Sequence, residues 1–237
     1  MTSGNRGYRR PAPGVHPRND SPAYASTAKR APKSPAIKIP HTLSEITGPR
    51  FDSASGPLVA HSANLTRFAG GTALGERIVV AGRVLDDDGR PVSHALIELW
   101  QANAAGRYAH PTDQHDAPLD PHFSGAARIL TGEDGDYRFI TIKPGAYPWR
   151  NHPNAWRPQH IHFSLFGAGM ATRLVTQMYF PGDPLLALDP IFNSIEDAAA
   201  RDRMVSRFEL DTTIAEYALG YQFDIVLRGR EATPAQE

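Results

Sequence analysis

The chain contains no cysteine among its 237 residues. Disulfide bonds, iron–sulfur clusters, thiolate metal sites and cysteine nucleophiles are therefore excluded at once. Any metal site must be built without thiolate ligands, from imidazole nitrogen and from oxygen donors. We expect a cytoplasmic location as the default for such a chain.

The chain also lacks net charge, because 25 basic residues balance 25 acidic ones. A neutral chain offers no electrostatic attraction for nucleic acid or for an anionic membrane. No apolar run approaches the roughly 18 residues needed to span a bilayer, and no secretory signal is expected, because no apolar stretch follows the basic N-terminus. The glycine-rich loops of nucleotide sites and the G-x-S-x-G turn of hydrolases are missing as well.

Two regions of different composition follow one another. Residues 1–75 are rich in proline, alanine, serine and lysine, a composition that cannot bury a core of its own. Either a disordered tail or an extended arm that contacts a partner subunit fits this region, and Ile37, Ile39 and Leu43 favour the arm. Residues 76–237 carry the pattern of one folded domain.

Short β-branched runs separated by turn signals fill the second region. The sequences at residues 86–89 and 133–136 mark two of the turns. This pattern predicts a β-sandwich or barrel rather than an α/β fold. One helix is expected over residues 195–208, with Asn193 or Ser194 as its N-cap. Its expected buried side consists of Ile195, Ala198, Met204, Val205 and Phe208.

The segment WRPQHIHFSLF, residues 156–166, places two histidines one residue apart on an expected strand. Side chains alternate along a strand, so His160, His162 and Ser164 share one face and the apolar residues between them share the other. Both imidazoles can turn onto one metal ion, since histidine is the commonest nitrogen ligand. The spacing alone fits a second interpretation equally well, in which the two histidines are partly exposed on a solvent-facing side of the strand.

Two tyrosines stand in settings unlike ordinary core positions. Tyr147 lies in a turn stiffened by Pro144 and Pro148, and Tyr108 begins a long irregular loop. Taken singly, each is more simply an amphipathic residue with its hydroxyl at the surface. Together with the two histidines they would form a shell of imidazoles and phenolates, whose hard oxygen donors suit ferric iron better than zinc.

Four segments together resemble the intradiol ring-cleaving dioxygenases, and within them the iron-bearing beta subunits of the members that act on protocatechuate. They are residues 82–108, 135–151, 156–167 and 176–184. The likeness covers nearly the whole chain, and tyrosine, tyrosine and H-x-H stand in the family's order. It implies an all-β fold: a β-sandwich core with long loops, one short helix and an extended N-terminal arm.

The resemblance also implies the composition of the metal site. A non-haem Fe(III), one per chain, would be held by Tyr108, Tyr147, His160 and His162. Tyr147 would be displaced by a catecholic substrate and would accept one of its protons. Arg157 would stabilise negative charge on the substrate ring, by the logic of a fixed cation beside developing charge.

Further roles rest on the resemblance alone. Catalytic roles fall to Tyr147, Arg157 and Gln177, and substrate-binding roles to Tyr24, Trp149, Arg157 and Ile191. Residues 76–237 would be the catalytic domain. The pocket would be completed by an alpha subunit within a larger hetero-oligomer.

The implied reaction is the cleavage of protocatechuate, 3,4-dihydroxybenzoate, by O2 to 3-carboxy-cis,cis-muconate, a step of aromatic catabolism in the β-ketoadipate pathway. The nearest rival is the same chemistry on catechol or hydroxyquinol, whose enzymes have a helical N-terminal domain unlike this proline-rich arm. A non-catalytic sandwich that binds a ligand, or a zinc hydrolase, would also fit an H-x-H strand. Metal content distinguishes the sandwich from a dioxygenase, and colour distinguishes the hydrolase, because zinc proteins are colourless.

Overall fold

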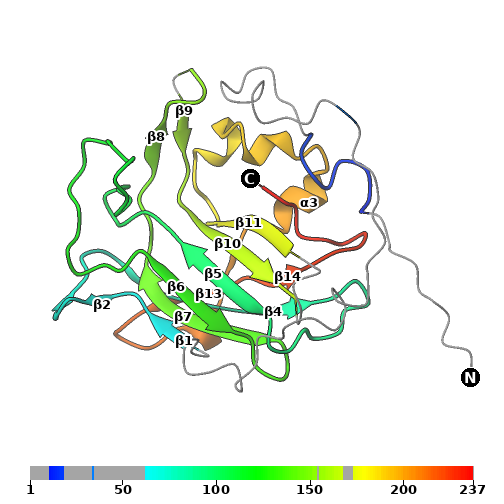
Figure 1. Ribbon diagram of the computed structural model, residues 1–237, viewed down its shortest axis with the longest axis horizontal. Coiled ribbons are helices and arrows are strands. Elements are labelled where there is room, and N and C mark those ends of the chain that lie inside the picture. The colour runs from blue at the N-terminus through cyan, green and yellow to red at the C-terminus, as the bar shows by residue number, and fades with distance from the viewer. Residues whose placement is uncertain (1–10, 19–33, 35–61, 154, 168–172, 237) are drawn as a thin grey trace, which may run out of the picture.

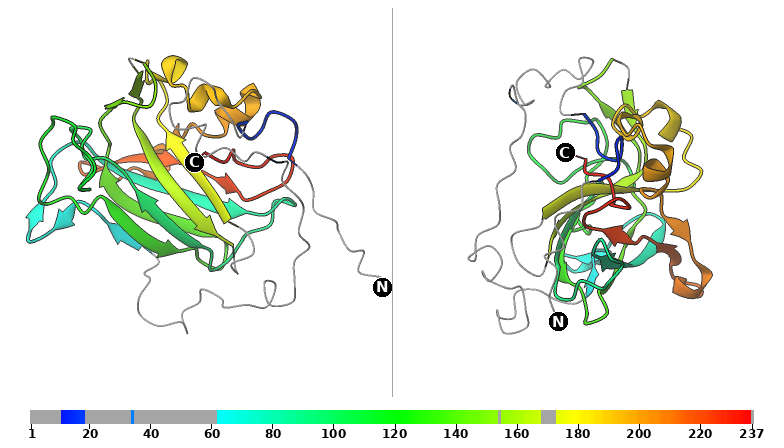
Figure 2. Two further views of the ribbon diagram at one scale, coloured as in Figure 1. Left: turned by 45° about the horizontal axis from the view of Figure 1, so that its top comes forward. Right: turned by 90° about the vertical axis from the view of Figure 1, so that its right-hand side faces the viewer.

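A computed structural model describes residues 11–18, 34, 62–153, 155–167 and 173–236 of the chain. Two β-sheets face each other across one hydrophobic core, and short hairpins and loops extend from their ends (Figure 1). The layered arrangement is also visible in the turned views of Figure 2. The predicted all-β fold with a β-sandwich core is confirmed.

The first sheet has the strand order β1-β7-β4-β13-β12, and β14 pairs with β4. Its strands are β1 (Ser62–Asn64), β4 (Arg77–Leu85), β7 (Asp136–Ile142), β12 (Arg207–Phe208), β13 (Leu219–Gln222) and β14 (Ile225–Val226). The second sheet has the order β11-β10-β5-β6. Its strands are β5 (Leu96–Trp100), β6 (Ala126–Leu130), β10 (His160–Phe166) and β11 (Arg173–Tyr179). Two hairpins stand apart: β2 (Arg67–Phe68) with β3 (Gly71–Thr72), and β8 (Tyr147–Trp149) with β9 (Ala155–Arg157).

The alternation predicted for the H-x-H strand is present in β10. Its apolar residues Ile161, Phe163 and Leu165 are fully buried between the sheets. The Phe163 ring centroid lies 6.1 Å from those of Tyr137 and Phe139, on β7 of the opposite sheet. Burying one such side chain contributes about 1.5–3 kcal/mol. The core therefore fixes the register of β10 and turns its two histidines to the opposite face of the sheet.

The predicted helix is shorter than expected and begins later. The helix α3 spans Ala198–Asp202, and its N-cap is Asp197, whose carboxylate accepts a backbone hydrogen bond of 2.7 Å from the first turn. The expected caps, Asn193 and Ser194, instead donate their side-chain hydrogen bonds to carbonyl oxygens earlier in the chain. The neighbouring 3-10 turns are η2 (Leu186–Leu188), η3 (Phe192–Ser194) and η4 (Leu210–Thr212).

The buried side predicted for this helix was partly wrong. Ile195 and Met204 are buried and Val205 is half-buried, but Ala198 is exposed and Phe208 is 50% exposed. The helix ends early because a backbone N–H of β11 donates to the Met204 carbonyl at 2.8 Å. Pairing with the edge of the second sheet thus replaces the last turns of the helix.

A second, smaller apolar cluster lies beside β11. It consists of Val15, Tyr179, Phe192, Ile195, Ala200, Met204 and Ala232. The cluster brings residues 11–18 next to residues 232–236, as the blue and red segments near α3 show in Figure 1. The backbone N–H of Ala235 donates to His16 Nδ1 at 3.0 Å, so segments from opposite ends of the described chain are joined directly.

Strand β1 begins at Ser62 and runs parallel to β7. The division into an arm of residues 1–75 and a catalytic domain of residues 76–237 stays a prediction. The residues that favoured the arm, Ile37, Ile39 and Leu43, lie outside the described residues. In the part of the chain that the structure describes, no helix has the length and apolar character needed to cross a membrane.

Candidate active site

The polar face of the second sheet gathers its functional side chains by cross-strand pairing. His162 on β10 lies opposite Trp100 on β5 and Gln177 on β11, and His160 lies opposite Tyr179. Directly opposed residues of antiparallel strands project to the same face. These five side chains therefore meet on one surface, and His160 there is only 1% exposed. The histidine face is a buried cluster of polar side chains, not a solvent face.

Each histidine is held in place by one neighbour. His160 Nδ1 lies 2.6 Å from the Pro158 carbonyl oxygen, which can only accept, so Nδ1 carries the proton and Nε2 keeps its lone pair. The His162 ring stacks on Trp100, with centroids 4.8 Å apart and planes at 4°. The two Nε2 atoms face each other at 3.2 Å.

The two tyrosines complete this cluster from outside the sheet. Tyr147 is on β8, directly opposite Arg157 in the β8–β9 hairpin, and its hydroxyl lies 3.2 Å from His160 Nε2. The Tyr108 hydroxyl lies 3.0 Å from His162 Nε2. The tyrosine rings meet edge to face, with centroids 5.4 Å apart. Two imidazole nitrogens and two phenol oxygens, far apart in sequence, thus converge on one point.

The loop that carries Tyr108 is fixed by hydrogen bonds to its backbone. The Tyr108 N–H donates to Asp113 Oδ2 at 2.8 Å. The Asn103 side chain accepts from the Arg107 N–H at 3.0 Å and donates to the Pro118 carbonyl at 2.9 Å. Such side-chain-to-backbone bonds replace the ladder that a loop lacks. They hold the Tyr108 phenol in a single position.

Gly106 allows this loop to lie against the turn that precedes Tyr147. Its φ is +77°, and a Cβ there would lie 2.3 Å from the Ala146 carbonyl oxygen and 3.3 Å from the Tyr147 Cβ. Only glycine accepts both the left-handed backbone and so close an approach. The distance between the two tyrosines therefore depends on this residue.

We expect Gly106→Ala to separate the two tyrosines and to lower both stability and metal content. A left-handed alanine costs about 1–2 kcal/mol, and the clash adds roughly 1–3 kcal/mol. Gly89→Ala is a matched control, because Gly89 has φ +76° with nothing within 4 Å. Urea unfolding and metal analysis of both variants make the comparison. Equal losses for both would show that the loop is not tightly packed against the turn.

Burial determines the protonation states of the two phenols and the two imidazoles in this cluster. It raises the pKa of the Tyr108 phenol well above its usual value, helped by the nearby Tyr147 phenol. It also raises the pKa of Tyr147, against the opposing effect of the Arg157 guanidinium. Burial and then Arg157 lower the pKa of both imidazoles, that of His162 to about 3. The histidines are therefore neutral with free lone pairs, and the phenols will ionise only beside a strong positive charge.

Arg157 lies at the centre of a second buried network beside this cluster. It is 2% exposed, and its Nε donates to Asp189 Oδ1 at 3.1 Å. Its Nη2 donates to Gln177 Oε1 and, at 3.2 Å, to the Tyr179 hydroxyl. Burial disfavours its charge, but the Tyr179 phenol and the Asp189 carboxylate keep its pKa raised. The guanidinium is thus a fixed cation beside the tyrosine and histidine donors.

The remaining predicted site residues that the structure describes, Trp149 and Ile191, lie beside the Arg157 network. The Arg157 guanidinium carbon lies 5.8 Å from the Trp149 ring centroid. Ile191 is half-buried, and its N–H donates to Asp189 Oδ1 at 3.2 Å. Trp156 alternates with Arg157 on β9, is 46% exposed and contacts His115, so it lies outside both networks. Tyr24 lies outside the described residues.

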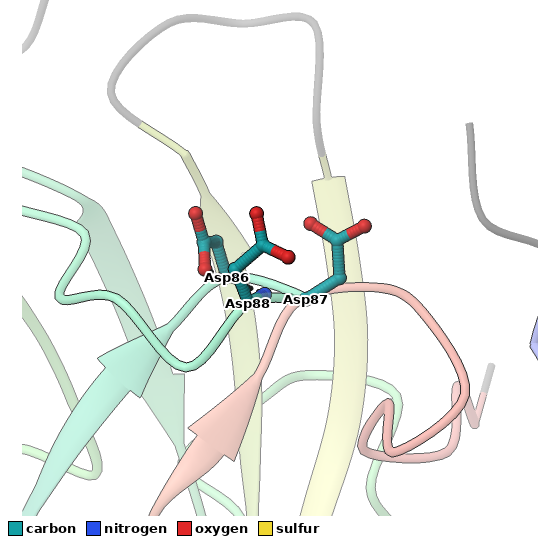
Figure 3. A group of neighbouring side chains, drawn as sticks. All are labelled: Asp86, Asp87 and Asp88. Atoms are coloured by element: carbon teal, nitrogen blue, oxygen red, sulfur yellow. Dashed lines mark hydrogen bonds between the residues drawn. The ribbon is translucent and has the colours of Figure 1, made fainter. Parts of the chain in front are cut away.

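A different acidic group lies in the turn after β4. The carboxylates of Asp86, Asp87 and Asp88 project to one side of this turn, with ligand atoms within 4.8 Å of one another (Figure 3). Their positions have local explanations: Asp86 accepts backbone N–H groups of the turn, Asp88 pairs with Arg90, and Asp87 pairs with Arg228. We therefore regard these three carboxylates as structural residues of the turn.

The convergent cluster fits a trivalent metal. It offers two neutral imidazole nitrogens and two phenol oxygens, and none of its four side chains is a carboxylate or a thiolate. Buried phenols that would not ionise by themselves can do so on a bound ferric ion, which lowers the pKa of its ligands. The binding of a metal by Tyr108, Tyr147, His160 and His162 stays a prediction of the sequence.

Comparison with known proteins decides the family. The profile described as "Dioxygenase" matches residues 46–229, and that described as "Protocatechuate 3,4-dioxygenase beta subunit N terminal" matches residues 8–42. The chain is 60% identical over 222 residues to the protocatechuate 3,4-dioxygenase beta chain of Burkholderia cepacia, covering 93% of this chain and 94% of that one. The chain belongs to the intradiol dioxygenase family.

Two further relatives are less similar in sequence. The protocatechuate 3,4-dioxygenase alpha chain of Pseudomonas putida is 31% identical over 84% of this chain and 97% of its own length. The crystal structure of catechol 1,2-dioxygenase from Pseudomonas arvilla C-1 matches with a TM-score of 0.53 and 27% identity, over 72% of this chain and 58% of that one. The intradiol dioxygenase family is one in which non-haem iron is expected.

Sequence reasoning missed several residues of the site. Asp189 and Tyr179 hold Arg157, yet Asp189 carries no motif, and Tyr179 was given no role although it lies within the family-like segment 176–184. Gln236 donates and accepts hydrogen bonds in the same network. A signal did exist for Trp100, because the alternation of β5 places it on the same face as Glu98, opposite the core.

Proposed function

We propose that this chain is the iron-bearing subunit of a dioxygenase that cleaves protocatechuate between its two hydroxylated carbons, giving 3-carboxy-cis,cis-muconate. The substrate rests on the 60% identity to a protocatechuate 3,4-dioxygenase beta chain. The chemistry rests on one observation: two phenol oxygens and two imidazole nitrogens are joined by three successive contacts of 3.0–3.2 Å in a buried cluster. The reaction belongs to the catabolism of aromatic compounds.

The proposed cofactor is one Fe(III), held by Tyr108, Tyr147, His160 and His162. When bound, the ferric ion would supply a Lewis acid that lowers the pKa of the catechol hydroxyls and activates the ring. The two imidazoles remain unprotonated for this task, because burial lowers the pKa of each. The Nδ1–H of His160, held by the Pro158 carbonyl, keeps its Nε2 turned toward the metal position.

Tyr147 is the proposed proton acceptor for the substrate. Its side chain lies opposite Arg157 in a two-stranded hairpin, so it can move without disturbing the sheet. Its phenolate Oη takes the proton of one catechol hydroxyl as the substrate enters. Because burial raises the pKa of the Tyr147 phenol, the neutral phenol then holds that proton firmly.

Arg157 is the proposed stabiliser of negative charge on the ring. Asp189 and Gln177 hold its guanidinium in one orientation, and no reorganisation is needed during the reaction. Gln177 and Trp149 both contact the Arg157 guanidinium, and the Ile191 N–H donates to Asp189. We assign substrate contacts to Trp149, Arg157 and Ile191, and to Tyr24 on the arm.

An alpha subunit is the proposed partner. The relatives include alpha chains as well as a beta chain of protocatechuate 3,4-dioxygenases, so those enzymes have two kinds of subunit. In this proposal the alpha chain contacts the arm of residues 1–75 and completes the pocket around the carboxylate of the substrate. Several alpha–beta pairs would form the complete enzyme.

The visible spectrum of the purified enzyme, co-expressed with its alpha chain, tests this function. We expect a red-brown absorption band from tyrosinate bound to ferric iron, with about one iron per beta chain. Anaerobic protocatechuate should shift this band, because the substrate changes the ligands of the iron. Admission of O2 should then yield the ring-opened product.

Two results would contradict the proposal. A colourless preparation that stays colourless after reconstitution with iron would exclude ferric phenolate ligation. A coloured enzyme that cleaves catechol or hydroxyquinol much faster than protocatechuate would support the proposed ring cleavage but contradict the proposed substrate. The comparison is sharp, because only protocatechuate carries a carboxylate for the proposed alpha subunit to bind.

A further inference from the structure

Gln236 is buried beside the Arg157 network although it lies near the end of the sequence. It is 2% exposed, and both ends of its amide are paired. Its Oε1 accepts from the Tyr179 hydroxyl at 2.8 Å, and its Nε2 donates to the Ile191 carbonyl at 2.9 Å.

The Tyr179 hydroxyl has more acceptors around it than it can serve. Gln236 Oε1 lies at 2.8 Å, Gln177 Oε1 at 3.1 Å and Asp189 Oδ2 at 3.3 Å. A hydroxyl has one proton, and the 2.8 Å contact has the length typical of an O–H···O bond. The proton therefore points to Gln236. The Tyr179 oxygen can then accept from Arg157 Nη2 at 3.2 Å.

This choice leaves the other two acceptors to Arg157. Gln177 Oε1 accepts from its Nη2, and Asp189 Oδ1 accepts from its Nε. Without the Gln236 amide, the Tyr179 proton would turn toward Asp189 Oδ2 or toward Gln177 Oε1, and at Gln177 it would compete with the guanidinium for the same oxygen. Gln236 thus determines the direction of the Tyr179 O–H bond, and the Tyr179 oxygen in turn contacts Arg157.

The other end of the amide reaches the opposite side of the same network. Gln236 Nε2 donates to the Ile191 carbonyl, and the Ile191 N–H donates to Asp189 Oδ1. One side chain therefore joins the partners of Arg157 to a residue assigned to the pocket wall. A ring of hydrogen bonds that is closed in this way has few competing arrangements.

Residues 232–236, here called the strap, hold Gln236 in place. The Thr176 hydroxyl donates to the Pro234 carbonyl at 2.7 Å, and the Gln236 N–H donates to the Val175 carbonyl at 2.9 Å. The Ala235 N–H donates to His16 at 3.0 Å. The strap is thus fixed along the edge of β11 independently of the Gln236 side chain.

We propose that Gln236 is a positioning residue for ring cleavage, acting through Tyr179 and Asp189 on the orientation of Arg157. The expected effect on kcat rests on the proposed function. The expected effect on the orientation of Arg157 does not. Gln236 touches neither substrate nor metal. It keeps the guanidinium aimed at the charge that develops on the ring.

Gln236→Met tests this role in the complete enzyme, because methionine has a similar length and no polar end. We expect unchanged iron content and resting spectrum, a KM within about two-fold of wild type, and a kcat lowered roughly ten-fold or more. Thr176→Val is the matched control: it removes the buried 2.7 Å bond to the strap but keeps the strap bonds to Val175 and His16, and it leaves the Tyr179 network intact. Its kcat should stay within about two-fold of wild type.

A double variant separates positioning from damage to the fold. In an Arg157→Lys background, Gln236→Met should lower kcat by less than about two-fold, because residues of one network are not additive. A full ten-fold loss in that background would overturn the proposal. So would a Gln236→Met enzyme that is no slower than the Thr176→Val enzyme.

A crystal structure of the Gln236→Met protein tests the same positioning role without an activity measurement. We expect the Arg157 guanidinium to leave its position on Gln177 and Asp189. An unmoved guanidinium would overturn the inference even if ring cleavage were confirmed. A wild-type enzyme without ring cleavage would instead contradict the proposed function, and this structure would still decide the role of Gln236.

Discussion

His160→Ala should yield a colourless protein that contains almost no iron and has no dioxygenase activity. His160 supplies a buried imidazole whose Nε2 lies 3.2 Å from both the Tyr147 hydroxyl and His162 Nε2. Loss of a partner that merely orients a ligand already costs about 10–100-fold in metal affinity, so loss of the ligand itself should exceed this range. Iron analysis and the visible spectrum of the purified enzyme provide the measurement.

His122→Ala is the control for this experiment. His122 is half-buried, and its Nδ1 lies 3.3 Å from the Phe68 carbonyl oxygen in the β2–β3 region. This variant should keep its iron, its colour and its activity. Iron retained at the wild-type level in His160→Ala would contradict the proposed ligand set. The expected result would place His160 among the ligands and leave the role of Tyr108 to a separate variant.

Asp189→Asn should destabilise the protein by about 3–5 kcal/mol, the usual cost of leaving one partner of a buried ion pair without its counter-charge. Asp189 is fully buried and Arg157 is 2% exposed, so water cannot solvate the guanidinium after the change. The asparagine has nearly the same shape, and the loss is therefore electrostatic. Unfolding of the complete enzyme in urea, compared with wild type, measures the difference in free energy.

Glu231→Gln gives the contrast for an exposed pair. Glu231 Oε2 lies 3.3 Å from Arg203 Nη1, but the Glu231 side chain is 80% exposed. Surface ion pairs contribute about 0–1 kcal/mol, so this variant should unfold almost like wild type. If Asp189→Asn were equally mild, Arg157 would have to find another partner or water. The view of Arg157 as a fixed cation would then fail.

Local patterns predicted most of the elements that carry the site. The period-two alternation in β10 placed the histidines together because Ile161, Phe163 and Leu165 have only the core as a low-energy environment. The tyrosines could be singled out by their loop and proline contexts, although the pattern alone favoured surface positions for each. The resemblance to a family joined these separate candidates into one set.

The predicted helix shows where local reasoning failed. Asn193 and Ser194 are good caps by type, but their side chains bond to carbonyls of the preceding turn, and Asp197 takes the cap. Whether a polar side chain caps a helix depends on which carbonyls and N–H groups surround it. Those neighbours come from the tertiary structure and not from residue type.

The sequence by itself determined which chemistry was open to this protein. It has no thiolate, two histidines on one face of a strand and two tyrosines in unusual settings, so a ferric site was the sharpest hypothesis. Only the tertiary structure decided how Arg157 is held. Its partners Asp189 and Tyr179, and Gln236 behind Tyr179, come from three separate segments of the chain. Long-range hydrogen bonds depend on how strands and loops pack, which no local periodicity records.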